Sequence, residues 1–216
     1  KSFLLEGENT LAIEVHNRSK KSSDISINAR LSSNQFNIGN PAEPTLTNIF
    51  DFNSSWIYYD GEVAPGQSWK TLSFDDSKWK NGLSELGFGD GDENTRLDFG
   101  GDSANKRPVY YFRKSFSLSS VNDASSLSMN LIYDDGAVVY INGKEVKRFN
   151  IDSGTVGHST FANSTVNNNA TASFNISSSY LNVGINTIAV SIHNRNVSSS
   201  DLSFDADLSS NQDNIG

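Results

Sequence analysis

The stretch at residues 127–149, LSMNLIYDDGAVVYINGKEVKRF, decides the fold class. Apolar side chains occupy every second position from Leu127 to Tyr133, and mostly polar ones lie between them, which is typical of a β-strand packed on one face. The runs at residues 137–141 and 144–149 flank Asn142-Gly143, the strongest short hairpin signal, because a type I′ turn needs a positive φ at both central residues. The stretch therefore predicts three consecutive strands.

The rest of the chain continues this pattern, and no segment keeps a 3.6-residue period. Further strands are predicted at residues 56–59, 110–118, 170–176, 185–194 and 202–208, with short helical turns near residues 76–79 and 178–181. Many short strands separated by turn residues favour an all-β fold, a two-sheet antiparallel β-sandwich or jelly roll.

The chain also contains a long internal repeat. Residues 7–39, GENTLAIEVHNRSKKSSDISINARLSSNQFNIG, align without a gap to residues 184–216, GINTIAVSIHNRNVSSSDLSFDADLSSNQDNIG, and each position lies 177 residues after its counterpart (216 − 39 = 177). A period of this size is that of a whole domain, so it indicates concatenated modules. We expect residues 1–39 to be the end of a preceding repeat and residues 49–216 to form one complete sandwich.

Residues 40–48 read as a linker between these repeats. Asn40, Pro41 and Pro44 are the expected inter-repeat residues, because proline holds its neighbours extended and gives a semi-rigid spacer. The preceding segment has two strand-like runs, residues 10–16 and 24–31, which need sheet partners. Either the chain is a window on a long array, or it is a subunit that donates these strands to another molecule. The array is favoured because the chain carries its own copy at residues 182–208.

Composition restricts the class of partner. With 216 residues, 36% of them hydrophobic and 11% aromatic, the chain can bury a sizeable core, and without cysteine it has neither disulfides nor thiolate metal sites. A net charge of −8 and a pI of about 4.8 argue against nucleic acid and anionic membranes and favour divalent cations. No apolar run approaches the roughly 20 residues of a membrane span.

The surface composition fits an extracellular or cell-surface protein. Asparagine and serine are abundant, and six Asn-x-Ser/Thr sequons are present, although a chain so rich in these residues also forms sequons by chance. The sequons begin at Asn17, Asn53, Asn163, Asn169, Asn175 and Asn196.

Several segments together resemble a known family. They are SWKTLSFDDSKWKNGLSELGFGDGDENT at residues 68–95, YYFRKSFSL at 110–118, LIYDDGAVVYINGKEVKRFNI at 131–151, YLNVGINTIAVSIHN at 180–194 and SSDLSFDADL at 199–208. The succession resembles the galactose-binding-like jelly-roll module repeated in large secreted bacterial proteins and, more distantly, the sugar-binding domain of family 2 glycoside hydrolases. The resemblance implies a sandwich fold and often a structural calcium ion. Its members include carbohydrate binders, adhesion modules and spacers, so it does not choose among these functions.

Three acidic residues are the candidate cation ligands. Asp90, Asp92 and Glu93 lie in the glycine-flanked segment GFGDGDENT, where alternate carboxylates can converge on one hard ion. A solvated acidic turn explains the same residues. The residues leave both readings open, and calcium as a structural cofactor is what the family resemblance implies.

Four other polar residues are ligand-binding candidates. Asp134 and Asp135 precede the hairpin and either face a ligand or form a tight turn with Gly136. His193 and Arg195 lie at the end of a long strand and recur in the first copy. They either contact a glycan or anchor the adjacent loop by hydrogen bonds.

Aromatic residues gather in the first half of the unit. Such rings either stack on the apolar face of a sugar or belong to the core, and their exposure decides between the two. The residues concerned are Trp56, Tyr58, Tyr59, Trp69, Trp79, Phe88 and Phe99.

No catalytic motif is present, so an enzyme is not expected. The favoured function is a structural or adhesive tandem repeat of an extracellular fibre, stalk or surface adhesin, whose partners are other copies of the repeat. Two alternatives stay open, a carbohydrate-binding module that acts through multivalency and a donor-strand filament subunit. A binding module should present an aromatic ring beside convergent polar groups, whereas a spacer should bury its tryptophans.

Overall fold

The computed structural model describes residues 47–121, 126–166 and 170–210, and the rest of the chain lies outside the described residues. The predictions for residues 1–39, including both unpartnered strands, and for Asn40, Pro41 and Pro44 fall there. The elements are β1 Thr47–Phe50, β2 Ser55–Tyr59, η1 Gln67–Lys70, β3 Lys80–Leu83, β4 Leu86–Phe88, β5 Thr95–Arg96, β6 Val109–Leu118, β7 Ser126–Tyr133, β8 Gly136–Ile141, β9 Lys144–Phe149, β10 Ala170–Ser177, η2 Ser178–Tyr180, β11 Gly184–His193 and β12 Leu202–Ser210.

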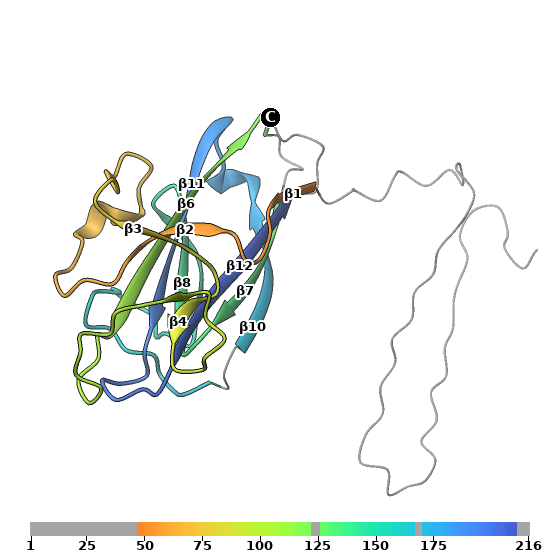
Figure 1. Ribbon diagram of the computed structural model, residues 1–216. Helices are drawn as coiled ribbons and strands as arrows, with labels where there is room; N and C mark the ends of the chain where they lie inside the picture. The colour runs from red at the N-terminus through yellow and green to blue at the C-terminus, as the bar shows by residue number, and fades with distance from the viewer. Residues whose placement is uncertain (1–46, 122–125, 167–169, 211–216) are drawn as a thin grey trace, which may run out of the picture. The chain divides into compact units, whose positions relative to one another are not determined.

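Two six-stranded sheets form a sandwich (Figure 1). The first sheet has the order β10-β7-β12-β4-β5, with β1 also paired to β12, and the second has the order β3-β2-β6-β11-β8-β9. Among the described strands, β4 and β5 are the parallel pair and the other pairings are antiparallel. The predicted all-β, two-sheet sandwich is confirmed.

The strands expected from periodicity within the described residues are all present. The hairpin of β8 and β9 turns at Asn142 (φ 51°) and Gly143 (φ 86°), as a type I′ turn requires. The helical turn expected near residues 178–181 is η2, whereas residues 76–79 form a turn closed by a hydrogen bond from the Trp79 N–H to the Asp76 carbonyl.

Sequence periodicity did not predict four short strands, β1, β3, β4 and β5. They have two to four residues each, too few to show alternation, and β4 lies between β12 and β5, which both pair with it. Thr47 and Asn48 were assigned to the linker, but both belong to β1 and pair with Ser210 and Ser209. The first sheet therefore begins two residues before the predicted boundary at residue 49.

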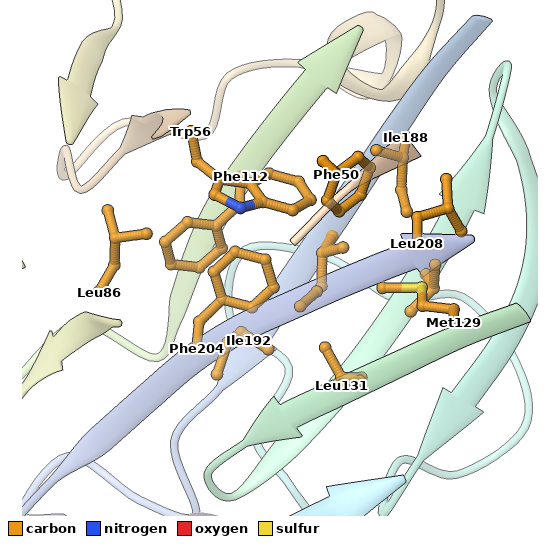
Figure 2. Packing of buried hydrophobic residues seen from close by; sticks show 14 of the residues in the cluster. Phe50, Trp56, Leu86, Phe112, Met129, Leu131, Ile188, Ile192, Phe204 and Leu208 are labelled. Atoms are coloured by element: carbon orange, nitrogen blue, oxygen red, sulfur yellow. The ribbon is translucent and has the colours of Figure 1, made fainter. Parts of the chain in front are cut away.

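The inner faces of the two sheets enclose the main core. Figure 2 shows Trp56 between Phe50 and Phe204, with ring centroids 5.4 and 4.9 Å apart. Phe204 also stacks on Phe112 across the sandwich at 4.1 Å. Met129 and the other inward residues of β7 complete this layer, as their alternation predicts.

The second sheet is covered on its outer face as well. All six residues of β8 are buried, and so are the last eight residues of β11. A second apolar cluster, which includes Trp69, Tyr111, Val138 and Tyr140, lies there beneath η1 and the loop around Val156. Within the described part of the chain no helix is long and apolar enough to cross a membrane.

Candidate functional site

A pocket opens in the outer face of the second sheet, and we call it the outer-face pocket. It is small and partly open to solvent, with a cavity volume of about 40 Å³. Strands β6, β8 and β11 form its floor, and η1 with the loop at residues 156–158 forms its walls. The lining residues on which the argument depends are Gln67, Trp69, Lys70, Tyr111, Tyr140 and His158.

Aromatic rings form most of the apolar lining. The ring of Trp69 lies edge-on to Tyr111 at 4.7 Å and to Tyr140 at 5.6 Å between centroids. The three rings are 4 to 6% exposed, so they are held rigidly by packing on one another. Burial also raises the pKa of Tyr140 to about 12, so its hydroxyl keeps its proton at neutral pH.

His158 closes one side of the pocket. Its ring is parallel to that of Tyr111, with 5.8 Å between centroids. Its Nε2 lies 2.9 Å from the Glu62 carbonyl oxygen and therefore donates, so in the neutral ring Nδ1 accepts from the Tyr111 hydroxyl at 3.0 Å. These contacts tie the loop at residues 156–158 to β6 and give the pocket a fixed wall.

Other polar groups at the pocket have no partner within the described chain. The side chain of Gln67 is exposed at the rim, and neither its amide nor the Tyr140 hydroxyl hydrogen bonds to a described residue. The Lys70 ammonium lies 4.5 Å from the centroid of the Tyr140 ring and forms no ion pair with a described carboxylate. Apolar rings beside a few unsatisfied polar groups are the usual composition of a small-molecule site.

His193 lines the pocket from below, but its imidazole is fully buried. Its Nδ1–H donates to the Thr160 carbonyl at 2.7 Å, so Nε2 accepts from the Ser191 hydroxyl at 2.8 Å. Burial lowers the pKa of His193 to about 4, so the ring is neutral. His193 therefore anchors the Thr160 loop, and it supports the pocket without presenting a free nitrogen to it.

Asp135 organises a different set of loops. Its carboxylate accepts hydrogen bonds from the Arg195 N–H at 2.7 Å, the Val166 N–H at 3.1 Å and the Ser199 hydroxyl at 3.3 Å. The side chain is 2% exposed. Arg195 takes part through its backbone, so both residues hold loops together and neither lines the outer-face pocket.

Asp134 lies beside Asp135 and is 1% exposed. Its Oδ1 is buried without a hydrogen bond to the described residues. Burial, a hydrogen bond to Asp135 and the charges of Asp135, Asp201 and Asp90 raise the pKa of Asp134 to about 8. At pH 7 the folded protein therefore holds Asp134 protonated, and it does not line the outer-face pocket either.

The three candidate cation ligands occupy one turn. The Glu93 carboxylate accepts from the Asp90 N–H at 3.0 Å and from the Gly91 N–H at 3.2 Å, so it closes the turn from inside. Asp90 receives a hydrogen bond from the Ser203 hydroxyl at 3.4 Å, and burial with the nearby charge of Asp201 raises its pKa. Among the described residues no three acidic or histidine side chains are grouped to hold a metal ion. Calcium binding stays a prediction.

Of the aromatic residues singled out in the sequence, Trp69 lies in the pocket. Trp56, Tyr58 and Phe88 belong to the main core, with Phe99 packed against it, while Tyr59 and Trp79 lie on the outer face beside Tyr111. Sequence reasoning missed Tyr111, Tyr140, Lys70 and Gln67. The unbroken apolar run AVVYI of β8 was an available signal, because such a run predicts a strand covered on both faces.

Comparisons with known proteins reveal a similar fold in solved structures. No family model matches the chain, and no curated protein does. The crystal structure of Bacteroides uniformis β-glucuronidase matches with a TM-score of 0.51 and 21% identity, over 77% of this chain and 18% of that chain. A β-glucuronidase from glycoside hydrolase family 2 matches with a TM-score of 0.44 and 19% identity, over 73% of this chain and 15% of that chain. A glycosyl hydrolase family 2 member from Bacteroides cellulosilyticus matches with a TM-score of 0.42 and 17% identity, over 76% of this chain and 20% of that chain.

The first match shows a shared fold, and the expected distant similarity to family 2 glycoside hydrolases is confirmed at that level. The chain spans only between 15% and 20% of the three structures it matches.

Proposed function

We propose that this protein is a non-catalytic carbohydrate-binding repeat of a longer extracellular protein. Two facts support the array and the absence of catalysis. The chain repeats itself at a domain-sized offset of 177 residues. The fold match corresponds to 18% of a β-glucuronidase, a small part of a whole glycosidase.

The outer-face pocket carries the proposal. The groups of Gln67, Lys70 and Tyr140 that have no partner among the described residues can bond to the substituents of a sugar ring, and the packed aromatic rings, which are 4 to 6% exposed, hold these groups in place. Because the walls are fixed by packing and by the hydrogen bonds of His158, little ordering is needed on binding. The pocket is small and partly open, so a single site should bind weakly and the repeats should add avidity.

A structural or adhesive spacer is the second candidate. It is favoured by the burial of Trp56 and Trp69, which are 0 and 6% exposed, as expected for a spacer. In that case the partners are other copies of the repeat, and calcium at Asp90, Asp92 and Glu93 would stiffen the array. The donor-strand subunit is weaker, because β11 and β12 already complete the sheets of their own chain.

Glycan binding by the 216-residue chain separates these functions. The chain is applied to a glycan array, and each hit is measured by isothermal titration calorimetry against the wild type and Tyr140→Phe. The variant keeps the ring and removes one free hydroxyl, so we expect affinity to fall about fivefold, which corresponds to about 1 kcal/mol for one hydrogen bond.

The matched control is Tyr133→Phe, which changes a half-buried tyrosine stacked on Phe149 in the core. It should bind as the wild type does. If no glycan binds, the carbohydrate-binding function is wrong and the spacer is preferred. If glycan binds and both variants behave alike, the outer-face pocket is not the site.

A further inference from the structure

The outer-face pocket differs in charge from the rest of the protein. The chain has 25 acidic and 17 basic residues. Among the described residues that line the pocket, none is an aspartate or a glutamate, and one is a lysine. A pocket without carboxylates in an acidic protein offers few acceptors to the hydroxyl donors of a neutral sugar.

Lys70 is the charged group at this pocket. It ends η1, is half-buried, and places its ammonium 4.5 Å from the centroid of the Tyr140 ring. The neighbouring cation Arg148 is already neutralised, because its guanidinium donates to both carboxylate oxygens of Glu145 at 2.6 and 2.7 Å. Lys70 has no such partner among the described residues, so its charge is available to a ligand.

The remaining free groups complement Lys70. The Tyr140 hydroxyl is protonated and can donate, and the Gln67 amide can both donate and accept. His158 has both ring nitrogens engaged, with Glu62 and Tyr111, so it offers nothing further. The pocket thus presents mainly donors, together with one uncompensated positive charge, beside an aromatic wall.

Resting on the proposed function, we propose that the outer-face pocket selects a sugar residue that carries an acidic substituent, a carboxylate or a sulfate. The acidic group lies against the Lys70 ammonium, and the ring substituents bond to the Gln67 amide and the Tyr140 hydroxyl. A charge-assisted hydrogen bond of this kind is stronger than one between neutral groups, so the acidic group determines which sugars bind.

The test uses the 216-residue chain and matched sugars measured by calorimetry or ligand-observed NMR. The pairs are methyl glucuronide with methyl glucoside, and methyl galacturonide with methyl galactoside, together with the 6-sulfates of both neutral sugars. We expect at least one acidic sugar to bind about tenfold more tightly than its neutral partner, the range for one hydrogen bond to a charged group. Comparing the affinities of the uronides with those of the 6-sulfates identifies which acidic group is preferred.

Lys70→Met keeps the approximate length of the side chain and removes the charge. Its affinity for the acidic sugar should therefore fall to its affinity for the neutral partner. Lys70→Arg should retain the preference. The matched control is Lys147→Met, because Lys147 also lies over an aromatic ring, 5.9 Å from the centroid of Phe149, but outside the pocket.

Each outcome separates this inference from the function on which it rests. Equal binding of acidic and neutral sugars by the wild type overturns the selectivity and leaves carbohydrate binding in place. A preference that survives Lys70→Met also overturns the role of Lys70. If no sugar in the panel or on the glycan array binds, both are wrong.

Discussion

Asp134→Asn should make the folded protein more stable at neutral pH, although it removes a buried aspartate. In the wild type the protonated carboxyl shares a hydrogen bond with Asp135, and burial with nearby charges raises its pKa from 3.8 to about 8. The unfolded chain therefore releases this proton above about pH 4, while the folded chain retains it up to about pH 8. The stability that Asp134 contributes is fully present below about pH 4 and is lost as the pH rises to about 8.

The size of the effect follows from the shift. Each pH unit inside this window costs somewhat more than about 1 kcal/mol, so the contribution falls by about 2 to 3 kcal/mol between about pH 5 and 7. His193 acts in the opposite sense, because its pKa is lowered from 6.5 to about 4 and its contribution is lost as the pH falls through that range. The two slopes partly cancel in the wild type below pH 6.5. The difference between the wild type and the Asp134→Asn variant isolates the contribution of Asp134, because both proteins contain His193.

Urea denaturation at half-unit steps from about pH 4.5 to 8 measures this difference. The amide introduced by Asp134→Asn imitates the protonated carboxyl and does not titrate. The free energy of unfolding of the variant, relative to that of the wild type, should therefore rise by about 2 to 3 kcal/mol between about pH 5 and 7. Asp51→Asn, at an exposed aspartate, is the control for the same chemical change. If the free energy of unfolding depends on pH in the same way in the wild type and in Asp134→Asn, Asp134 does not retain its proton in the folded protein.

Three further predictions concern stability. Gly87→Ala should lower the free energy of unfolding, measured by urea denaturation, by about 3 kcal/mol. The added Cβ would lie 2.0 Å from the Leu202 carbonyl oxygen and overpack β4 against β12. A loss below about 0.5 kcal/mol contradicts this. Asp135→Asn should cost about 2 to 3 kcal/mol and speed hydrogen exchange at the Arg195 amide, and unchanged exchange contradicts it. In force spectroscopy, pulling through Thr47 and Ser210 unzips β1 from β12 pair by pair, so it should need less force than pulling through Thr47 and Asp201, and equal forces contradict it.

The parts of the fold that the sequence predicts are those with local signals. Alternation in residues 127–133 and the Asn142-Gly143 turn depend on neighbouring residues, so β7, β8 and β9 could be predicted. The short strands β4 and β5 have no such signal. β4 pairs with β12, which is distant in sequence, as Leu86 does with Phe204, and β5 pairs in parallel with β4, so both strands depend on the assembled sheet.

The candidate site was harder to predict, because a side chain's type does not reveal the direction in which it points. Asp135 and His193 have the chemistry of ligand contacts, yet both satisfy backbone and hydroxyl groups inside the protein. Tyr111 and Tyr140 read as ordinary strand residues, and they become pocket residues only when η1 covers the outer face of the second sheet. The unbroken apolar run of β8 indicates that this strand is covered on both faces, but no local pattern identifies η1 as the segment that covers it.

The positions of the terminal strands bear on the choice between stalk and binding array. Thr47 pairs with Ser210, so the described domain begins and ends at neighbouring positions in the first sheet, whereas the outer-face pocket opens on the far side of the second sheet. Tension along an array would load the short β1–β12 ladder one hydrogen bond at a time, a poor arrangement for a stiff stalk.

The same arrangement suits a display of binding sites. In the proposed array, linkers attached to the first sheet would leave the opposite layer accessible, so each repeat could present its pocket. Repeats joined in this way in such an array would raise the effective concentration of a polymeric glycan at each site, which is how weak single sites produce useful avidity.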